Sequence, residues 1–251
     1  MADHTDSLAG RTVLITGAAH RIGNAIVRTL HGAGANIVLH YRRSRAGAEA
    51  LAAELSATRG GSMQLVSGDL HDTARLPLLV EEAFNCYGRL DVLVNNASSF
   101  YPTPVGTIEE SHWDDLIGTN LKAPLFLAQA AAPHLRRHGG VIVNLVDIHA
   151  DRPLSGHPVY SIAKAGLVMV TKSLAAELGP EIRVNAVAPG AILWPETDMD
   201  EANRRNIVER TFLKRRGDPS DIAGAVLYLV RDARYVSGHV LVVDGGRSLY
   251  S

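Results

Sequence analysis

Tyr160 and Lys164 are the residues whose types and spacing most directly suggest chemistry, and Asp147 stands thirteen residues before the tyrosine. A spacing of four residues is about one helical turn, so the phenol and the ammonium are expected on one face of a helix. An isolated phenol titrates near pH ~10 and is a weak acid at neutral pH. A neighbouring ammonium favours the phenolate and lowers the pKa of the phenol. The pair therefore predicts a proton donor adjusted for use near neutral pH.

A second candidate site is the segment from Thr16 to Gly23, which contains Gly17 and joins the first expected strand to the first expected helix. Small residues let the backbone approach a pyrophosphate, and the helix N-terminus provides N–H donors and the positive end of a dipole. Glycines also occur in any tight strand–helix turn, which is the alternative interpretation. The position in a first βαβ unit favours dinucleotide binding.

The end of the second expected strand indicates which dinucleotide would bind. An NAD site usually has an Asp or Glu there, about 20 residues after the first glycine. Here no acidic residue occurs between Ser7 and Ala48. Guanidinium groups and a hydroxyl suit a 2′-phosphate, so the sequence predicts NADPH. The alternative is a solvated basic loop, which would leave cations near the positive end of a helix dipole. The residues concerned are His40, Tyr41, Arg42, Arg43, Ser44 and Arg45.

Two further strand ends carry polar residues that could line this site. Asp69 follows the third expected strand, where it could accept a hydrogen bond from an adenine amino group or cap the next helix together with Asp72. Asn95 and Asn96 end the fourth expected strand, where amide side chains can tie neighbouring strands together and shape the floor under a cofactor. Both interpretations of Asp69 stay open at this point.

Composition and charge exclude several classes of function. The chain has 251 residues, 46% hydrophobic and 20% charged, which is typical of one globular α/β domain. The net charge of −1 gives no general attraction to nucleic acid or anionic membranes. Cys86 is the only cysteine, which excludes an internal disulfide and favours a reducing compartment. Residues 1–9 show no signal peptide and no apolar run reaches the ~20 residues of a membrane span, so a cytoplasmic protein is expected.

The elements that must position these residues alternate along the whole chain. Apolar runs typical of buried strands cover residues 11–16, 36–40, 63–67, 91–94, 141–146, 183–188 and 240–243. Helical patterns cover residues 22–32, 46–57, 73–87, 108–118, 121–137, 159–178 and 219–230, the last with Asp218 as its cap and Pro219 in its first turn. This alternation predicts βαβ units with right-handed crossovers, and hence one α/β domain over residues 1–251 with a doubly wound parallel sheet of the Rossmann type.

Together, these motifs resemble the short-chain dehydrogenase/reductase family, over about residues 8 to 248. In the family's order they are Thr16-Gly17 with Gly23, Asn95-Asn96-Ala97, Asn120, Tyr160-x-x-x-Lys164, Pro189-Gly190 and Asp244-Gly245-Gly246. The resemblance implies that Tyr160 donates the proton and that Lys164 lowers its pKa and binds the nicotinamide ribose. It also implies that Asn120 holds a water leading to Lys164, and that the protein is a homotetramer.

A narrower resemblance is to pteridine reductases. It is carried by Arg21, Asp147 in place of the family's usual serine, Trp194, and the segments 39–44 (LHYRRS) and 95–104 (NNASSFYPTP). In pteridine reductases an aromatic residue at the position of Phe100 stacks on one face of the pterin, and nicotinamide covers the other. The resemblance also implies that Arg21, Arg43 and Ser44 line the NADPH phosphates, with Arg21 also near the pterin, and that Ser98 meets the polar edge of the pterin.

Asp147 has a physical rationale of its own. A carboxylate only accepts hydrogen bonds, so it would repel the alkoxide that develops when a ketone is reduced. It can accept instead from Tyr160 or from a ring N–H, and help to pass a proton to an imine nitrogen. Reduction of a C=N bond in a dihydropterin needs this, because hydride goes to ring carbon and the proton to ring nitrogen. The alternative is that Asp147 caps a strand end and that the substrate is a ketone.

The sequence therefore predicts an NADPH-dependent pteridine reductase acting on a (dihydro)pterin or dihydrofolate, with Asp147, Tyr160, Lys164 and Asn120 as its catalytic residues. The alternatives are a ketone reductase of the same family, acting on a 3-oxoacyl thioester or a sugar, and a dinucleotide sensor without activity. The residues expected to bind NADPH are Gly17, Arg21, Ile22, Gly23, His40, Tyr41, Arg42, Arg43, Ser44, Asp69, Leu70, Asn96, Ala97, Tyr160, Lys164, Pro189 and Gly190. Those expected at the substrate are Ser98, Phe100, Asp147, Tyr160, Leu193 and Trp194.

The segment 192–212 is expected to form a mobile lid over the substrate. Leu193, Trp194, Pro195 and Met199 are candidate walls of the pocket, although Trp194 could equally pack the lid down. No metal is expected, because His134 and His138 at helical spacing have no third ligand nearby in the sequence.

Overall fold

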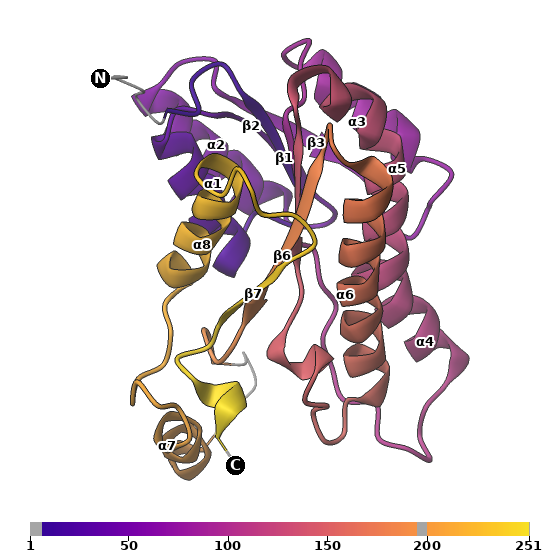
Figure 1. Cartoon of the computed structure of the whole chain (residues 1–251), viewed down its shortest axis with the longest axis vertical. Coiled ribbons are helices and arrows are strands. Elements are labelled where there is room, and N and C mark those ends of the chain that lie inside the picture. Colours follow the sequence, from indigo (N-terminus) through magenta and orange to yellow (C-terminus); the bar gives the residue numbers. More distant parts are fainter. Residues whose placement is uncertain (1–6, 195–199, 251) are drawn as a thin grey trace.

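The computed structural model describes residues 7–194 and 200–250 and confirms the predicted fold class (Figure 1). Seven parallel strands form one sheet in the order β3-β2-β1-β4-β5-β6-β7, so the chain winds outward from β1 in two directions. The strands are β1 (Thr12–Ile15), β2 (Asn36–Tyr41), β3 (Met63–Ser67), β4 (Val92–Asn95), β5 (Val141–Leu145), β6 (Arg183–Pro189) and β7 (Val240–Val243).

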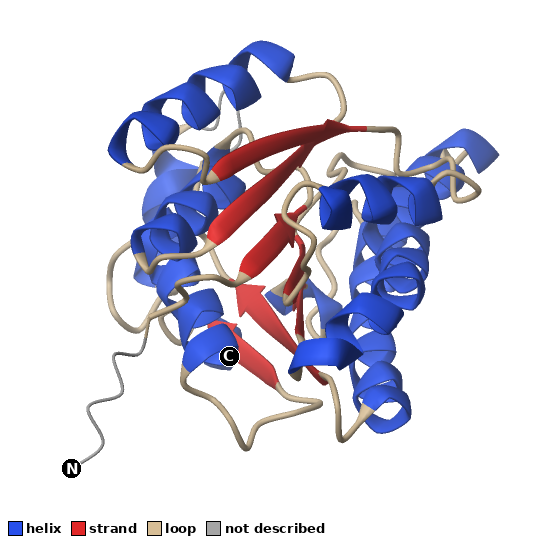
Figure 2. Cartoon of the chain, turned by 90° about the horizontal axis from the view of Figure 1, so that it is seen from above, coloured by secondary structure: helices blue, strands red, loops and turns tan. Residues whose placement is uncertain are grey.

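Helices cover both faces of this sheet, as the buried strands require (Figures 1 and 2). One apolar core packs the first face against α1 (Arg21–Gly32), α2 (Arg45–Thr58) and α8 (Pro219–Arg231). A second core packs the other face against α3 (Leu76–Asn85), α5 (Ala123–Leu135) and the end of α6 (Pro158–Leu178). The remaining helices are α4 (Glu110–Ile117) and α7 (Glu201–Glu209), with the short helices η1 (Gly118–Lys122), η2 (Arg136–His138), η3 (Ile148–Ala150) and η4 (Arg247–Leu249).

The segment predicted as two helices at 108–118 and 121–137 forms one continuous rod. The π-helix η1 joins α4 directly to α5, and the Ala123 amide donates to the Gly118 carbonyl in the wide π pattern. Pro124 explains this turn, because proline has no N–H and its ring crowds the carbonyl of Asn120, four residues earlier. Single π turns inside α-helices are frequent at functional sites.

One predicted helix begins later than expected, and one observed helix was not predicted. The helix predicted over 73–87 begins only at Leu76, because the residues before it form successive tight turns, including a Thr73 amide bonded to the His71 carbonyl. Helix α7 was not predicted, because none of its residues is buried and it has no apolar face to give a period. Its sequence signal is the cap, since the side chain of Asp200 accepts from the Asn203 amide at 2.7 Å.

Several predicted supports of the fold are confirmed. Asp218 caps α8 by accepting from the Ser220 amide at 2.9 Å, and Pro219 stands in the first turn. The side chain of Asn95 donates to that of Asn144 on β5 at 2.8 Å, and Asn144 donates onward to Thr171 of α6 at 2.9 Å. These buried amides tie β4, β5 and α6 together beneath the candidate site.

Helix α6 has 21 residues, and an 18-residue window of it has a mean hydropathy of 1.2, so it meets the length and composition of a membrane span. The core helix of a soluble protein can meet the same condition, and Lys164, Lys172 and Glu177 interrupt its apolar residues. In this structure it lies along the sheet and the second core (Figure 1), and some of its apolar residues, such as Leu167 and Leu178, pack inside the domain.

Candidate active site

The candidate site lies along the carboxyl edge of the sheet. Gly17 follows β1, Arg42 follows β2 and Asp147 follows the end of β5. Strand β1 pairs in parallel with both β2 and β4, so the chain order of the sheet reverses at this point. Open α/β sheets bind ligands at such a switch point.

Tyr160 and Asp147 form a direct hydrogen-bonded pair. The Tyr160 hydroxyl donates to Asp147 Oδ2 at 2.8 Å, while Oδ1 accepts from the backbone amide of His149 at 2.9 Å. Asp147 therefore caps η3 and holds the phenol at the same time, so both sequence interpretations of its contacts hold. Burial raises the pKa of Tyr160 well above its ordinary value, and the charge of Asp147 and its hydrogen bond raise it further.

The expectation that Lys164 lowers the pKa of Tyr160 is wrong for this structure. Lys164 Nζ donates to the Leu145 carbonyl at 2.8 Å and lies 5.6 Å from the centroid of the Tyr160 ring. Burial lowers the pKa of the ammonium to about 8, against the opposing charge of Asp147. The phenol is closer to a carboxylate than to a cation, so burial and Asp147 determine the direction of its pKa shift.

Ser98 and Asn120 form the other side of this centre. Ser98 Oγ donates to Asn120 Oδ1 at 2.7 Å. Asn120 Nδ2 donates to the carbonyls of Ser99 and Leu116, both at 2.9 Å, so these two bonds hold the amide in one orientation. A hydrogen bond with Ser98 also acts on Tyr160, where it lowers the pKa against the larger effects of burial and Asp147.

A cavity of about 350 Å³ extends from this centre towards β2 and β3. It brings together most of the predicted phosphate-end residues, namely Gly17, His40, Tyr41, Arg42, Arg43, Ser44, Asp69, Leu70 and Ala97, with Ser98 from the predicted substrate set. The predicted cofactor residues that do not line it are Arg21, Ile22, Gly23, Asn96, Tyr160, Lys164, Pro189 and Gly190. The lining combines guanidinium, hydroxyl and carboxylate groups, which suits the phosphates, ribose and adenine of a dinucleotide.

Asn96 and Gly23 lie outside the cavity but support the backbone around Gly17, which lines it. Gly17 has φ +60°, and a Cβ there would stand 2.8 Å from the Cα of Ala97. Asn96 Nδ2 donates to the carbonyls of Thr16 and Gly17 at 2.9 and 3.0 Å, which ties β4 to the glycine turn. A Cβ on Gly23 would lie 2.6 Å from that same nitrogen, so the helix can approach only with glycine there. The predicted tie between strand ends is confirmed for Asn96.

His40 and Arg42 differ sharply in burial although only Tyr41 separates them. His40 is buried, accepts from the Gly17 amide at 3.3 Å through Nδ1, and donates from Nε2 to the Gly68 carbonyl at 3.1 Å. Burial lowers the pKa of His40 to about 4, so the ring is neutral at pH 7 and bridges β1 to the end of β3. The Arg42 side chain is 39% exposed and lies 3.6 Å from Asp69.

Asp69 does not cap the next helix, which begins after Arg75. Its carboxylate instead accepts from the backbone amide and the ring Nδ1 of His71, at 3.0 and 2.9 Å. Burial raises the pKa of Asp69, but these bonds and the charge of Arg42 outweigh it and lower the pKa overall. The side chain is half exposed and lines the cavity, so the predicted contact with adenine stays a prediction.

Phe100 lies beside Tyr160, the candidate proton donor. Its ring stacks on His157 with centroids 4.8 Å apart and meets the Tyr160 ring edge-on, also at 4.8 Å. The side chain is 50% exposed, which is high for a large apolar residue. A half-exposed aromatic side chain is thus held close to the candidate proton donor.

The lid segment is described in part, and Pro195 and Met199 lie outside the described residues. Leu193 packs against the first core instead of facing an open cavity. The Trp194 ring has the guanidinium groups of Arg204 and Arg216 at 5.8 and 5.4 Å from its centroid, so these contacts pack the lid together.

Five residues that line the cavity were not predicted, and each lies within two residues of a predicted one. They are Ala19, His20, His71, Ser99 and Thr119. Arg247 of η4 was also missed, although it directly follows the Asp244-Gly245-Gly246 motif. It donates to the Ile207 carbonyl of α7 at 3.1 Å and lies within electrostatic range of Asp147. Among the described residues, no group of three or more His, Cys, Asp or Glu could hold a metal ion.

Comparison with known proteins shows which family this chain is similar to. The model of the family described as Enoyl-(Acyl carrier protein) reductase matches residues 17–248. Pteridine reductase 1 of Leishmania tarentolae is 36% identical over 288 aligned positions, which cover 98% of this chain and 99% of that protein. The 3-oxoacyl-(acyl-carrier-protein) reductase FabG of Staphylococcus aureus strain Mu50 is 35% identical, covering 94% of this chain and 97% of that protein.

A solved structure has the same fold over nearly the whole chain. The chain superposes with a TM-score of 0.92 on a crystal structure from Sinorhizobium meliloti 1021, described as a short-chain alcohol dehydrogenase. The two are 34% identical, and the alignment covers 98% of this chain and 100% of the other. Relatives that differ in substrate thus share nearly the whole length of the chain.

Proposed function

The chain belongs to the short-chain dehydrogenase/reductase family of oxidoreductases, and on that premise we propose that it is an NADPH-dependent pteridine reductase. The proposed reaction adds hydride to the carbon, and a proton to the nitrogen, of a C=N bond in a (dihydro)pterin or dihydrofolate. The observation that carries the proposal is the hydrogen bond of 2.8 Å from the Tyr160 hydroxyl to Asp147.

The pair suits a nitrogen acceptor better than a carbonyl. Tyr160 has a raised pKa, so it keeps its proton at neutral pH. A nitrogen that gains electron density as hydride arrives is strongly basic and can take a proton from such a weak acid. A developing alkoxide at the same position would face the Asp147 carboxylate, which has no hydrogen to donate. Lys164, with its pKa lowered to about 8, can exchange protons near neutral pH and restore the phenol.

The cofactor assignment rests on the charge of the cavity lining. When bound, NADPH supplies the hydride. Arg42, Arg43 and Ser44 would hold its 2′-phosphate, since they line the cavity and no carboxylate follows β2 directly. Asp69 would meet the adenine, and the backbone around Gly17 would approach the pyrophosphate. By the family's pattern, Lys164 would hold the nicotinamide ribose.

Phe100 supports the choice of a flat ring as substrate. The half-exposed Phe100 ring lies beside Tyr160, and stacking of parallel aromatic planes would fix a pterin against it. Ser98 would meet the polar edge of that ring. The 36% identity to a pteridine reductase is consistent with this choice, but the 35% identity to a 3-oxoacyl reductase makes a ketone reductase the second candidate.

One assay separates these functions. Oxidation of NADPH is followed optically with dihydrobiopterin, dihydrofolate and an acetoacetyl thioester in parallel. We expect turnover with the pterin and not with the thioester. Turnover with the thioester alone would establish the ketone reductase, and binding of NADPH without turnover of any substrate would favour a dinucleotide sensor.

We also propose that the enzyme is a cytoplasmic homotetramer, as the family pattern implies. Exposed apolar side chains on α5 and α6 support an assembly through these helices, namely Leu125, Phe126, Ile162 and Met169. Light scattering coupled to size exclusion would give four times the chain mass of 26.9 kDa. A monomer at micromolar concentration would overturn this part of the proposal.

A further inference from the structure

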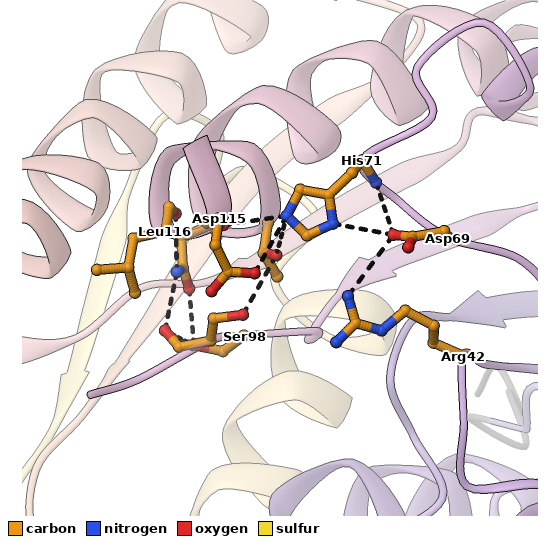
Figure 3. Close-up of polar contacts among 9 residues, drawn as sticks. Arg42, Asp69, His71, Ser98, Asp115 and Leu116 are labelled. Atoms are coloured by element: carbon orange, nitrogen blue, oxygen red, sulfur yellow. Dashed lines mark hydrogen bonds and ion pairs between the residues drawn. The ribbon is translucent and has the colours of Figure 1, made fainter. Parts of the chain in front are cut away.

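His71 connects two parts of the site that are far apart in the sequence (Figure 3). On one side its Nδ1 lies 2.9 Å from Asp69 Oδ1, at the end of β3. On the other side its Nε2 lies 3.2 Å from Thr119 Oγ1 on η1, and 3.3 Å from both the carbonyl and Oδ1 of Asp115 on α4. The ring therefore spans from the cofactor cavity to the rod formed by α4, η1 and α5.

The contact with Asp69 determines which nitrogen of the His71 ring carries a hydrogen. A carboxylate at Asp69 only accepts, so Nδ1 carries the hydrogen of that bond in either protonation state of the ring. The ring also packs closely on the rod, because a Cβ on Gly118 would lie 2.6 Å from its Cδ2. Asp115 extends the contact network, since it accepts a hydrogen bond from Tyr101, which with burial raises the pKa of that phenol to about 12.

The rod leads from His71 to the catalytic centre. Thr119 and Asn120 are neighbours in η1, and Asn120 accepts from Ser98, which acts on Tyr160. At the opposite end, Asp69 is shared between His71 and Arg42, which lies at 3.6 Å. A polar chain thus runs from the guanidinium expected at the 2′-phosphate to the candidate proton donor.

We propose that His71 is a positioning residue through which the 2′-phosphate of the cofactor strengthens the hold on Asn120. The proposal rests on the function proposed above. A phosphate at Arg42 competes with Asp69 for the guanidinium. The Asp69 carboxylate, less engaged by Arg42, then accepts a stronger hydrogen bond from His71 Nδ1. The bond between His71 Nε2 and Thr119 then holds η1 more firmly. NADPH, and not NADH, produces this effect, so part of the preference for NADPH appears in kcat and not only in KM.

The test compares the ratio of kcat with NADPH to kcat with NADH in wild type, His71→Asn and His71→Gln, on whichever substrate the wild type reduces. Mutations along such contact networks change coupling about 2- to 30-fold, and we expect the ratio to fall by a factor in this range in both variants. His138→Asn, at an exposed histidine of η2, is the matched control and should keep the wild-type ratio. An unchanged ratio in both His71 variants would overturn the proposal.

A second readout does not depend on turnover. Hydrogen exchange of the amides in residues 118–122 is measured with saturating NADP⁺ and with saturating NAD⁺. In the wild type NADP⁺ should slow exchange more than NAD⁺ does, and in His71→Asn the two should act alike. Equal protection in the wild type would overturn the coupling even if the enzyme reduces pterins. Failure of pterin turnover, by contrast, leaves this experiment intact and removes only the substrate assignment.

Discussion

Tyr160 and Lys164 are 5% and 3% exposed, whereas the Arg42 side chain at the other end of the site is 39% exposed. At the buried end, desolvation raises the pKa of Tyr160 and lowers that of Lys164 to about 8. At the exposed end, water and salt screen the guanidinium groups, so the interaction of each arginine with a ligand is weaker. Proton transfer and cofactor choice therefore depend on charge in different ways.

The difference concerns coupling as well as strength. Groups that share a buried site change one another's pKa, and the effects of their substitutions are not additive. Exposed cations act more independently, and ionic strength modulates them. Substitutions at the catalytic end should accordingly have the larger effects, and those at the phosphate end the smaller and more salt-dependent ones.

The largest effect is expected from Tyr160→Phe. It removes the proton donor and leaves the ring that packs against Phe100. Loss of a positioned acid or base typically reduces kcat by about 10²–10⁴-fold, and we expect a loss in this range with little change in the dissociation constant for NADPH. Steady-state kinetics and a fluorescence titration of NADPH measure the two quantities. A variant that keeps more than half of the activity would remove Tyr160 from the mechanism.

The buried ammonium predicts a pH effect on stability. Lys164 has a pKa of about 8 in the folded protein and an ordinary value of 10.5. Between these pH values the unfolded chain binds the extra proton, so the free energy of unfolding should rise with pH. Below about pH 8 the ammonium is charged in both states, and its burial lowers stability by up to about 3 kcal/mol.

Urea unfolding of the wild type and of Lys164→Met between pH 7 and 9.5 isolates the contribution of Lys164 to the free energy of unfolding. The difference in free energy between the two proteins should shift in favour of the wild type as pH rises through about 8. Lys172→Met replaces an exposed lysine of the same helix and serves as the control. A difference that stays constant with pH would show that Lys164 is not desolvated as the structure indicates.

The role of the Asp147 carboxylate is tested by two substitutions, one that removes its charge and one that also shortens the side chain. Asp147→Asn removes the charge and keeps one of the two oxygen acceptors used by His149 and Tyr160, with an NH₂ donor in place of the other, while Asp147→Ser restores the residue usual in the family. We expect pterin turnover to fall about 10- to 100-fold in both, with unchanged affinity for NADPH, because the carboxylate that accepts from Tyr160 is lost. Only the serine variant should gain activity towards a ketone. Unchanged pterin turnover would reduce Asp147 to a cap of η3.

The sequence predicted the sheet and the order of its elements because buried parallel strands are uninterrupted apolar runs, as in Val92–Asn95 and Val141–Leu145. It also predicted which strand ends carry the candidate site residues. The π turn at Gly118–Lys122 was not predicted, because it depends on the competition between Pro124 and the helical hydrogen bonds of the preceding turn. Helix α7 was missed because it is polar on every side.

Electrostatics at the site could not be obtained from spacing. The spacing of four from Tyr160 to Lys164 suggested a lowered phenol pKa, but the direction depends on burial and on a carboxylate thirteen residues away in sequence and 2.8 Å away in space. The same limit applies to His71, whose partners Asp115 and Thr119 lie on another element. Sequence spacing gives contacts within one helix, whereas these pairs are set by how elements pack.

The smallest effect is expected at the exposed end, from Arg43→Ala. Loss of one exposed charge contact weakens binding by about 1 kcal/mol, so KM for NADPH should rise about fivefold while KM for NADH changes little. Added salt should raise KM for NADPH in the wild type, and less steeply in the variant, because one screened contact is already absent. Arg45→Ala is the control, since Arg45 does not line the cavity and is paired with Glu49 at 2.7 Å. Equal effects of Arg43→Ala on both cofactors would contradict the 2′-phosphate role. A loss in kcat as large as that of Tyr160→Phe would mean that the two ends are coupled strongly, and that exposure does not separate them.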